Sequence, residues 1–230
     1  MRCYKTYLFD LDGTLTDSQV GITNSLRYAL SRMSITEADH IRLDKFIGPP
    51  LLESFKKHYN LTDNRARQAV AYYREYYAEK GIFENTVYEG IPAVLADLDR
   101  RGAKLILATS KASVYAQRVL EHFGLDRHFD GVYGSHFDLS RAAKTEIIAD
   151  IVNETEHRAE GPFVMIGDHR DDVIGARENG MDSVAVTYGY GSEKELEEAQ
   201  PTYIVHSVTE LAVLFDCCAG NSGHAQIGPP

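Results

Sequence analysis

The stretch TYLFDLDGT at residues 6–14 decides how the rest of this sequence is interpreted. Its first four residues are β-forming types, which favours a buried strand over residues 6–9. Two carboxylates, Asp10 and Asp12, follow where the strand pattern ends. The carboxyl ends of parallel strands form the ligand-binding edge of a sheet, so this position favours chemistry. A plain Asp-Gly turn is the competing explanation.

Further short β-forming runs continue along the chain, and helical patterns separate them. They lie at residues 103–108, 131–133, 163–166, 183–187 and 203–205. Strands that alternate with helices are typical of βαβ units, whose strands run parallel. We therefore predict an α/β fold with a Rossmann-like, doubly wound parallel sheet.

A long interval between the first strand and residue 103 lacks strand-like runs. Three helical patterns fill it, with room for a fourth helix: residues 20–33, 51–59 and 64–80. Helices that follow one another without strands indicate a separate all-helical unit inserted into the α/β chain.

The domain boundaries follow from this interval. We predict a core formed by residues 1–17 and 88–218, with an inserted helical domain over residues 18–87. The segment 219–230 is rich in Gly, Asn and Pro, which predicts a disordered tail.

Composition narrows the classes of partner. The chain has 230 residues, with 24 Lys and Arg against 34 Asp and Glu, for a net charge of −10. This charge has the wrong sign for binding a nucleic acid polymer or an anionic membrane. No apolar run reaches the roughly 18 residues that a membrane span needs, and the first residues show no signal-peptide pattern. We therefore expect a cytoplasmic protein. If its substrate is an anion, binding must come from a few local cations, backbone N–H groups and a metal ion, because the net charge repels the substrate.

A second acidic segment, MIGDHRDD at residues 165–172, also follows an apolar strand pattern. A helix N-cap formed by one of its aspartates is the ordinary explanation. Capping needs only one carboxylate, however, and two acidic strand ends side by side would repel each other without a cation. Because the available ligands are oxygens and no Cys is near, the sequence favours Mg²⁺ over Zn²⁺.

Hydroxyls and lysines occupy two further positions of interest. Thr109, Ser110 and Lys111 follow the run at residues 103–108, and Lys144 begins a helical pattern ahead of the fourth strand. Each alone is ordinary, because Ser and Thr commonly cap helices and Lys is usually a solvated surface residue.

Together and in this order, the four segments resemble the haloacid dehalogenase superfamily of phosphatases. That family carries Asp-x-Asp-Gly-Thr, a strand-end Thr or Ser, a Lys, and Gly-Asp-x-x-x-Asp, and its C1-type helical cap is similar to the insertion. The resemblance implies that Asp10 is a nucleophile forming an aspartyl-phosphate and that Asp12 is the general acid and base. An Asp at position 12 favours phosphate esters, because the dehalogenases and phosphonate-cleaving relatives lack it.

The same resemblance implies the rest of the site. Thr109 and Lys144 would hold phosphoryl oxygens beside the nucleophile. The Mg²⁺ ligands would be Asp10, the backbone carbonyl of Asp12, Asp168 and Asp172.

Substrate contacts are expected from two places. Ser110 and Lys111 lie beside Thr109 and would reach the phosphate or the substrate, with surface exposure of Lys111 as the alternative. Gly48 and Pro49 belong to a Gly-Pro-Pro loop that breaks the helical pattern where a cap would face the site, and a simple helix connector is the alternative.

Finer similarity favours one branch of the family. Residues 45–51, 88–90 and 188–192 resemble the phosphoglycolate phosphatase-like branch, which includes bacterial 5′-nucleotidases. The sequence leaves open whether a further feature, four tyrosines at i, i+4 spacing, packs in the core or forms an interface: Tyr72, Tyr73, Tyr76 and Tyr77.

The resulting prediction is an enzyme that hydrolyses small phosphomonoesters with Mg²⁺ through an aspartyl-phosphate. Phosphoglycolate, a sugar phosphate and a nucleoside monophosphate are the candidate substrates. The alternatives are a phosphomutase of the same superfamily and a non-catalytic binding protein on the same scaffold. We expect a monomer or a homodimer.

Overall fold

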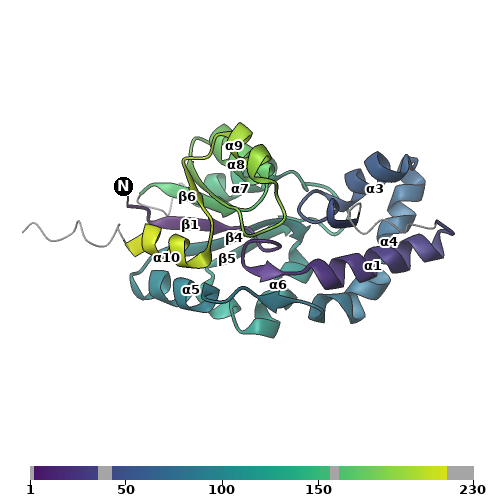
Figure 1. The fold of residues 1–230 in the computed structure, drawn as a ribbon, viewed down its shortest axis with the longest axis horizontal. Helices are drawn as coiled ribbons and strands as arrows, with labels where there is room; N and C mark the ends of the chain where they lie inside the picture. The colour runs from purple at the N-terminus through teal and green to yellow at the C-terminus, as the bar shows by residue number, and fades with distance from the viewer. Residues whose placement is uncertain (1–2, 36–42, 156–160, 217–230) are drawn as a thin grey trace, which may run out of the picture.

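The computed structural model describes residues 3–35, 43–155 and 161–216. A six-stranded parallel sheet forms its centre, in the order β5-β4-β1-β6-β7-β8 (Figure 1). These strands are β1 (Thr6–Phe9), β4 (Lys104–Ala112), β5 (Gly131–Ser135), β6 (Phe163–Gly167), β7 (Asp182–Val186) and β8 (Tyr203–Val205). The predicted fold class, an α/β parallel sheet with a helical insertion, is confirmed.

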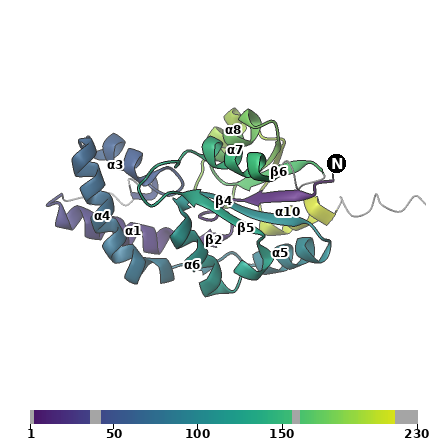
Figure 2. The same cartoon turned by 180° about the vertical axis from the view of Figure 1, so that it is seen from behind.

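Helices cover both faces of this sheet (Figures 1 and 2). One layer contains α7 (Lys144–Thr155), α8 (Arg170–Glu178) and α9 (Glu193–Ala199). The other contains α5 (Ile91–Arg100), α6 (Ser113–Phe123) and α10 (Val208–Asp216), and η2 (Asp126–His128) follows α6.

Strand β1 lies at the centre because both of its faces are buried. Leu8 packs with Ile148 of α7 on one face of the sheet. Tyr7 and Phe9 pack on the opposite face, in the core beneath α5, α6 and α10. This alternation follows from the two-residue repeat of a strand. Neighbouring strands β4 and β6 pair with β1 in register, so Leu8 lies opposite Ile106 and Met165.

The helical insertion lies between two short strands that sequence reasoning did not predict. β2 (Thr16–Asp17) and β3 (Thr86–Val87) pair antiparallel and bring the two ends of the insertion together. Between them are α1 (Gln19–Arg32), α3 (Leu51–Tyr59), α4 (Asp63–Glu79) and η1 (Gly81–Phe83). Two-residue strands were missed because such a run is too short to show a period.

The insertion lies beyond the carboxyl ends of the central strands, opposite the N-terminus (Figures 1 and 2). Several contacts among the described residues join it to the core, including two hydrogen bonds and a ring contact. Arg118 of α6 donates to the backbone carbonyl of Ala78 at 2.9 Å, and Arg74 of α4 donates to that of Phe137 at 2.6 Å. The rings of Phe83 and His122 meet edge to face at 5.0 Å. The insertion therefore covers the edge of the sheet where β1, β4 and β6 end.

Two further expectations concern the termini and membranes. The predicted tail, 219–230, lies outside the described residues. Among the residues that are described, the helices are all too short or too polar to cross a bilayer.

Candidate active site

Three carboxylates predicted as metal ligands meet at the carboxyl ends of β1 and β6. Asp10, Asp168 and Asp172 each offer an oxygen within 4.8 Å of the others. All three side chains are buried, with 4%, 2% and 1% of their surface exposed. The chain brings them together because β1 and β6 are paired neighbours and α8 begins directly after β6.

Lys144, at the first residue of α7, is also buried here rather than solvated. Its Nζ lies 2.9 Å from Asp10 Oδ1 and 2.6 Å from Asp172 Oδ1, and it donates to the backbone carbonyl of Ala108 at 2.9 Å. Burial alone would lower the pKa of Lys144, but the two carboxylates raise it above its ordinary value. The lysine therefore remains charged and offsets part of the negative cluster.

One ammonium does not balance three carboxylates. Burial, together with the charges of Asp10 and Asp172, raises the pKa of Asp168 from 3.8 to about 7. Burial likewise raises the pKa of Asp172 to about 6, with Lys144 opposing the shift and Asp10 adding to it. Oxygen ligands with uncompensated negative charge suit a hard divalent cation such as Mg²⁺, so the residues present fit the predicted metal.

Asp168 is held by groups for which the motifs indicated no such role. The backbone N–H of Tyr190 donates to Asp168 Oδ2 at 2.7 Å, and Thr14 Oγ1 donates to Oδ1 at 3.4 Å. Gly13 and Gly189 both lie so close that a Cβ at either position would overlap the Asp168 side chain. The alternating glycines of residues 188–192 were the available signal, because close backbone approach requires glycine.

Asp172 has a structural role as well as its place in the cluster. Its Oδ2 accepts from the backbone N–H of His169 at 3.1 Å, which forms half of a capping box at the start of α8. The N-cap residue itself is His169, whose ring accepts from Asp171 N at 3.4 Å. The same Asp172 carboxylate therefore takes part in the capping box of α8 and in the acidic cluster, and both interactions hold it at the first turn of this helix.

Asp12 points away from the three clustered carboxylates. Its Oδ1 forms an ion pair with Lys111 Nζ at 2.7 Å, and the two side chains are only 10% and 7% exposed. Surface exposure of Lys111, the alternative considered for it, is excluded by this geometry. Lys111 is therefore a buried ion-pair partner of Asp12.

Thr109 and Ser110 lie on a strand rather than at a helix start. β4 continues to Ala112, four residues beyond the predicted run, and α6 begins at Ser113. Thr109 is 2% exposed and its hydroxyl accepts from the backbone N–H of Lys111 at 3.3 Å. The helix-capping explanation for these hydroxyls is therefore wrong.

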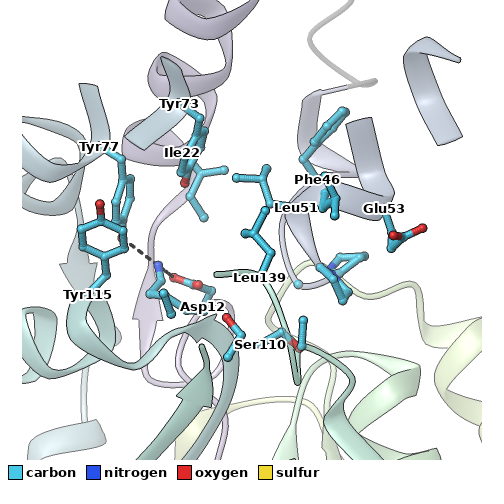
Figure 3. A pocket seen from close by; sticks show the side chains of 18 of the residues that line it. Asp12, Ile22, Phe46, Leu51, Glu53, Tyr73, Tyr77, Ser110, Tyr115 and Leu139 are labelled. Atoms are coloured by element: carbon cyan, nitrogen blue, oxygen red, sulfur yellow. Dashed lines mark hydrogen bonds and ion pairs between the residues drawn. The ribbon is translucent and has the colours of Figure 1, made fainter. Parts of the chain in front are cut away.

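A cavity separates the insertion from the core above Asp12 (Figure 3). The expected substrate residues Gly48, Pro49, Ser110 and Lys111 all line it. Aromatic side chains contribute much of the remaining wall: Phe46, Tyr73, Tyr77 and Tyr115.

The tyrosine-rich helix α4 divides between two environments. Tyr73 and Tyr77 are buried, stack at 5.3 Å between centroids, and line the cavity. Tyr76 is half-buried and donates to Glu84 at 3.0 Å, and the guanidinium of Arg32 lies 4.5 Å over the Tyr72 ring. Tyr73 and Tyr77 thus belong to the interface between insertion and core, which spacing alone could not reveal.

Comparison with known proteins defines the class. The family model described as haloacid dehalogenase-like hydrolase matches residues 7–186. The chain belongs to the haloacid dehalogenase-like hydrolases, and the predicted family and enzyme class are confirmed.

Individual relatives cover almost the whole chain. The 5′-nucleotidase of Pseudomonas aeruginosa is 46% identical over 92% of this chain and 94% of its own length. The tyrosine-protein kinase PtkA of Mycobacterium tuberculosis is 37% identical over 88% of this chain and 68% of that protein. A solved structure described as a predicted phosphatase from Clostridium acetobutylicum has a TM-score of 0.87 at 44% identity, with 92% of this chain and 98% of that one covered. Phosphoglycolate phosphatases of Vibrio parahaemolyticus and Caulobacter vibrioides match at 25% and 29% identity, which agrees with the predicted branch.

Proposed function

We propose that this protein is a Mg²⁺-dependent phosphatase that hydrolyses nucleoside monophosphates through an aspartyl-phosphate on Asp10. One observation carries the proposal. The buried Lys144 forms ion pairs with Asp10 and Asp172 in a cluster of three carboxylates, and Asp12, two residues after Asp10, lines an aromatic cavity.

The chemistry divides one displacement into two. A carboxylate oxygen of Asp10 attacks phosphorus, the ester P–O bond breaks, and the leaving alkoxide takes a proton from Asp12. In the second step Asp12 takes a proton from a water molecule, whose oxygen attacks phosphorus and returns Asp10 to its carboxylate with release of phosphate.

Charge at the phosphoryl group is the main obstacle, because the substrate is an anion and the site is acidic. Lys144 and the hydroxyl of Thr109 stabilise the phosphoryl oxygens. Asp10, the backbone carbonyl of Asp12, Asp168 and Asp172 would hold Mg²⁺, which would supply electrostatic stabilisation of the phosphoryl group.

The cavity favours a nucleoside as the leaving group. Its aromatic walls suit the flat face of a nucleobase. Among the described residues that line it, the cations are Lys111 and Arg74, and protein acceptors already engage both. A carboxylate such as that of phosphoglycolate would therefore enter without a free partner, whereas an uncharged base would not need one. The name of the Pseudomonas aeruginosa relative points to the same substrate class.

A substrate panel tests this function. Purified protein with Mg²⁺ is incubated with nucleoside 5′-monophosphates, sugar phosphates and phosphoglycolate, and released phosphate is measured. We expect kcat/KM for the best nucleotide to exceed that for phosphoglycolate by at least about tenfold, the scale of one pocket contact. Asp10→Asn is the matched control and should release no phosphate. A preference for phosphoglycolate, or release by the folded Asp10→Asn variant, would contradict the proposal.

A further inference from the structure

Lys111 joins the two parts of the molecule at one atom. Its Nζ donates to Asp12 Oδ1 at 2.7 Å and to Tyr77 Oη at 2.7 Å (dashed lines in Figure 3). Asp12 follows β1 in the core, whereas Tyr77 lies on α4 of the insertion. Lys111 is 34 positions from Tyr77 and 99 from Asp12 in sequence. The pairing of β1 with β4 brings Asp12 and Lys111 together, and the packing of the insertion on the core adds Tyr77. We call this group the Asp12–Lys111–Tyr77 clasp.

The clasp is rigid because its surroundings are packed. Tyr77 is 1% exposed, stacks on Tyr73, and meets the ring of Tyr115 edge to face at 5.4 Å. The backbone N–H of Lys111 is held by Thr109 Oγ1. Moving the Lys111 ammonium away would deprive the buried Asp12 carboxylate and Tyr77 hydroxyl of this hydrogen-bond donor, which costs free energy.

We propose that Lys111 and Tyr77 are positioning residues that fix Asp12 for proton transfer to the leaving group only when the insertion is closed on the core. This inference rests on the proposed function, and it assigns to Tyr77 a role beyond lining the cavity. Motion of α4 away from the core would remove the Tyr77 hydroxyl from the ammonium. Lys111 would stay beside Asp12 because both belong to the core, but its ammonium would no longer be fixed by Tyr77. The Asp12 carboxylate would then be oriented less well, and leaving-group protonation would become slower.

This role predicts a leaving-group effect. An alkoxide needs a proton as it departs, whereas a nitrophenolate departs with little help. Misplacement of Asp12 therefore harms an alkyl phosphate more than an aryl phosphate. 4-Nitrobenzyl phosphate and 4-nitrophenyl phosphate form a suitable pair, because they differ in leaving-group acidity and share almost the same ring.

The experiment compares Tyr77→Phe and Lys111→Met with Tyr76→Phe, which makes the same change one residue earlier on α4 but removes a hydrogen bond to Glu84. In the first two variants we expect kcat/KM for the benzyl ester to fall about tenfold or more, and for the phenyl ester about threefold or less, on the scale of one lost hydrogen bond to a charged group. Tyr76→Phe should leave the ratio of the two esters at the wild-type value. Equal losses on both esters in Tyr77→Phe and Lys111→Met would overturn the proposal.

A second measurement does not depend on turnover. Hydrogen exchange followed by mass spectrometry should show faster exchange in peptides containing residues 74–78 and 109–113 in Lys111→Met than in the wild type. Unchanged exchange there would show that Lys111 does not hold the insertion closed, and would overturn the proposal. If the wild-type protein released no phosphate from any substrate, the proposed function would fail, and exchange would still judge the clasp.

Discussion

At the residue scale, Gly13 lies directly against Asp168, which we propose as a metal ligand. Its φ of +83° is a left-handed conformation that glycine adopts easily, and a Cβ there would overlap both Asp168 and the ring of Tyr190. Gly102 has a similar φ of +73° and nothing within 4 Å of its Cβ position. Substitutions at the two glycines can therefore distinguish the effect of backbone strain from the effect of displacing the Asp168 side chain.

Gly13→Ala should therefore have two effects and Gly102→Ala only one. Both should lower the free energy of unfolding by about 1–2 kcal/mol through the left-handed backbone. Only Gly13→Ala should also raise the Mg²⁺ concentration needed for half-maximal phosphate release, about tenfold or more, because supporting residues of a metal site contribute that much. Thermal melts and Mg²⁺ titrations measure the two effects. An equal Mg²⁺ requirement in both variants would show that Gly13 does not position Asp168.

Residue-scale predictions from sequence succeeded where a residue's position along a strand determined its place. Asp10 and Asp168 could be predicted to meet because each follows an apolar strand pattern, and parallel strands end at one edge. Tyr77 and Tyr190 could not, because their partners are set by how distant elements pack. No local period carries that information.

At the element scale, the Gly-Pro-Pro loop ahead of α3 connects the insertion to the active site. Gly48, with φ +100°, places its Cα beside the ring of His169, and Pro49 and Pro50 line the cavity. The loop therefore faces both the cavity above Asp12 and the start of α8.

Changing both Pro49 and Pro50 to Ala should alter the choice of leaving group and spare the metal requirement. The ratio of kcat/KM values between a nucleotide and a sugar phosphate should change about tenfold, the scale of one or two pocket contacts. Pro92→Ala, an exposed proline at the start of α5, is the control for a proline change outside the cavity. Parallel losses on all substrates would show that the loop only connects two elements.

Element boundaries show where sequence reasoning ends. The helices at residues 51–59 and 64–80 were placed to within one residue, because their apolar spacing and their caps agree. The end of β4 was placed four residues short, because Thr109, Ser110 and Lys111 break the apolar pattern, whereas the backbone pairs with β5 at Thr109 and, after a register shift, again at Ala112. The polar residues that a binding site needs interrupt the apolar pattern by which a strand is predicted, so the end of such a strand is placed too early.

At the scale of the whole molecule, the buried acidic cluster links stability to pH and Mg²⁺. The pKa values of Asp168 and Asp172, about 7 and about 6, are above their ordinary value of 3.8. A raised carboxyl pKa stabilises the folded state fully below about pH 4, and this contribution is lost as pH rises through the folded-state value. Metal-free protein should therefore lose stability between about pH 4 and about pH 7.

Mg²⁺ should offset that loss, because it binds the ionised carboxylates. The rise in melting temperature on adding Mg²⁺ should be small near pH 5 and should grow to several degrees near pH 8, on the scale of about 1 kcal/mol or more. Asp168→Asn should show a flatter pH profile without metal and a smaller response to Mg²⁺. The same Mg²⁺ response at both pH values would be evidence against a cluster that exchanges protons for a cation.

Trapping the aspartyl-phosphate is the most direct test of phosphoryl transfer through Asp10. Asp12→Asn should slow water attack and accumulate the aspartyl-phosphate when the substrate is an aryl phosphate with an easy leaving group. The measurement is acid quenching within the first turnover, borohydride reduction of the acyl phosphate, and peptide mass spectrometry.

In Asp12→Asn we expect residue 10, and no other residue, to be converted to the reduced alcohol. The double variant Asp10→Asn/Asp12→Asn should show no conversion. A variant that turns over without labelling residue 10, or that carries the phosphoryl group on a tyrosine or another residue, would contradict it.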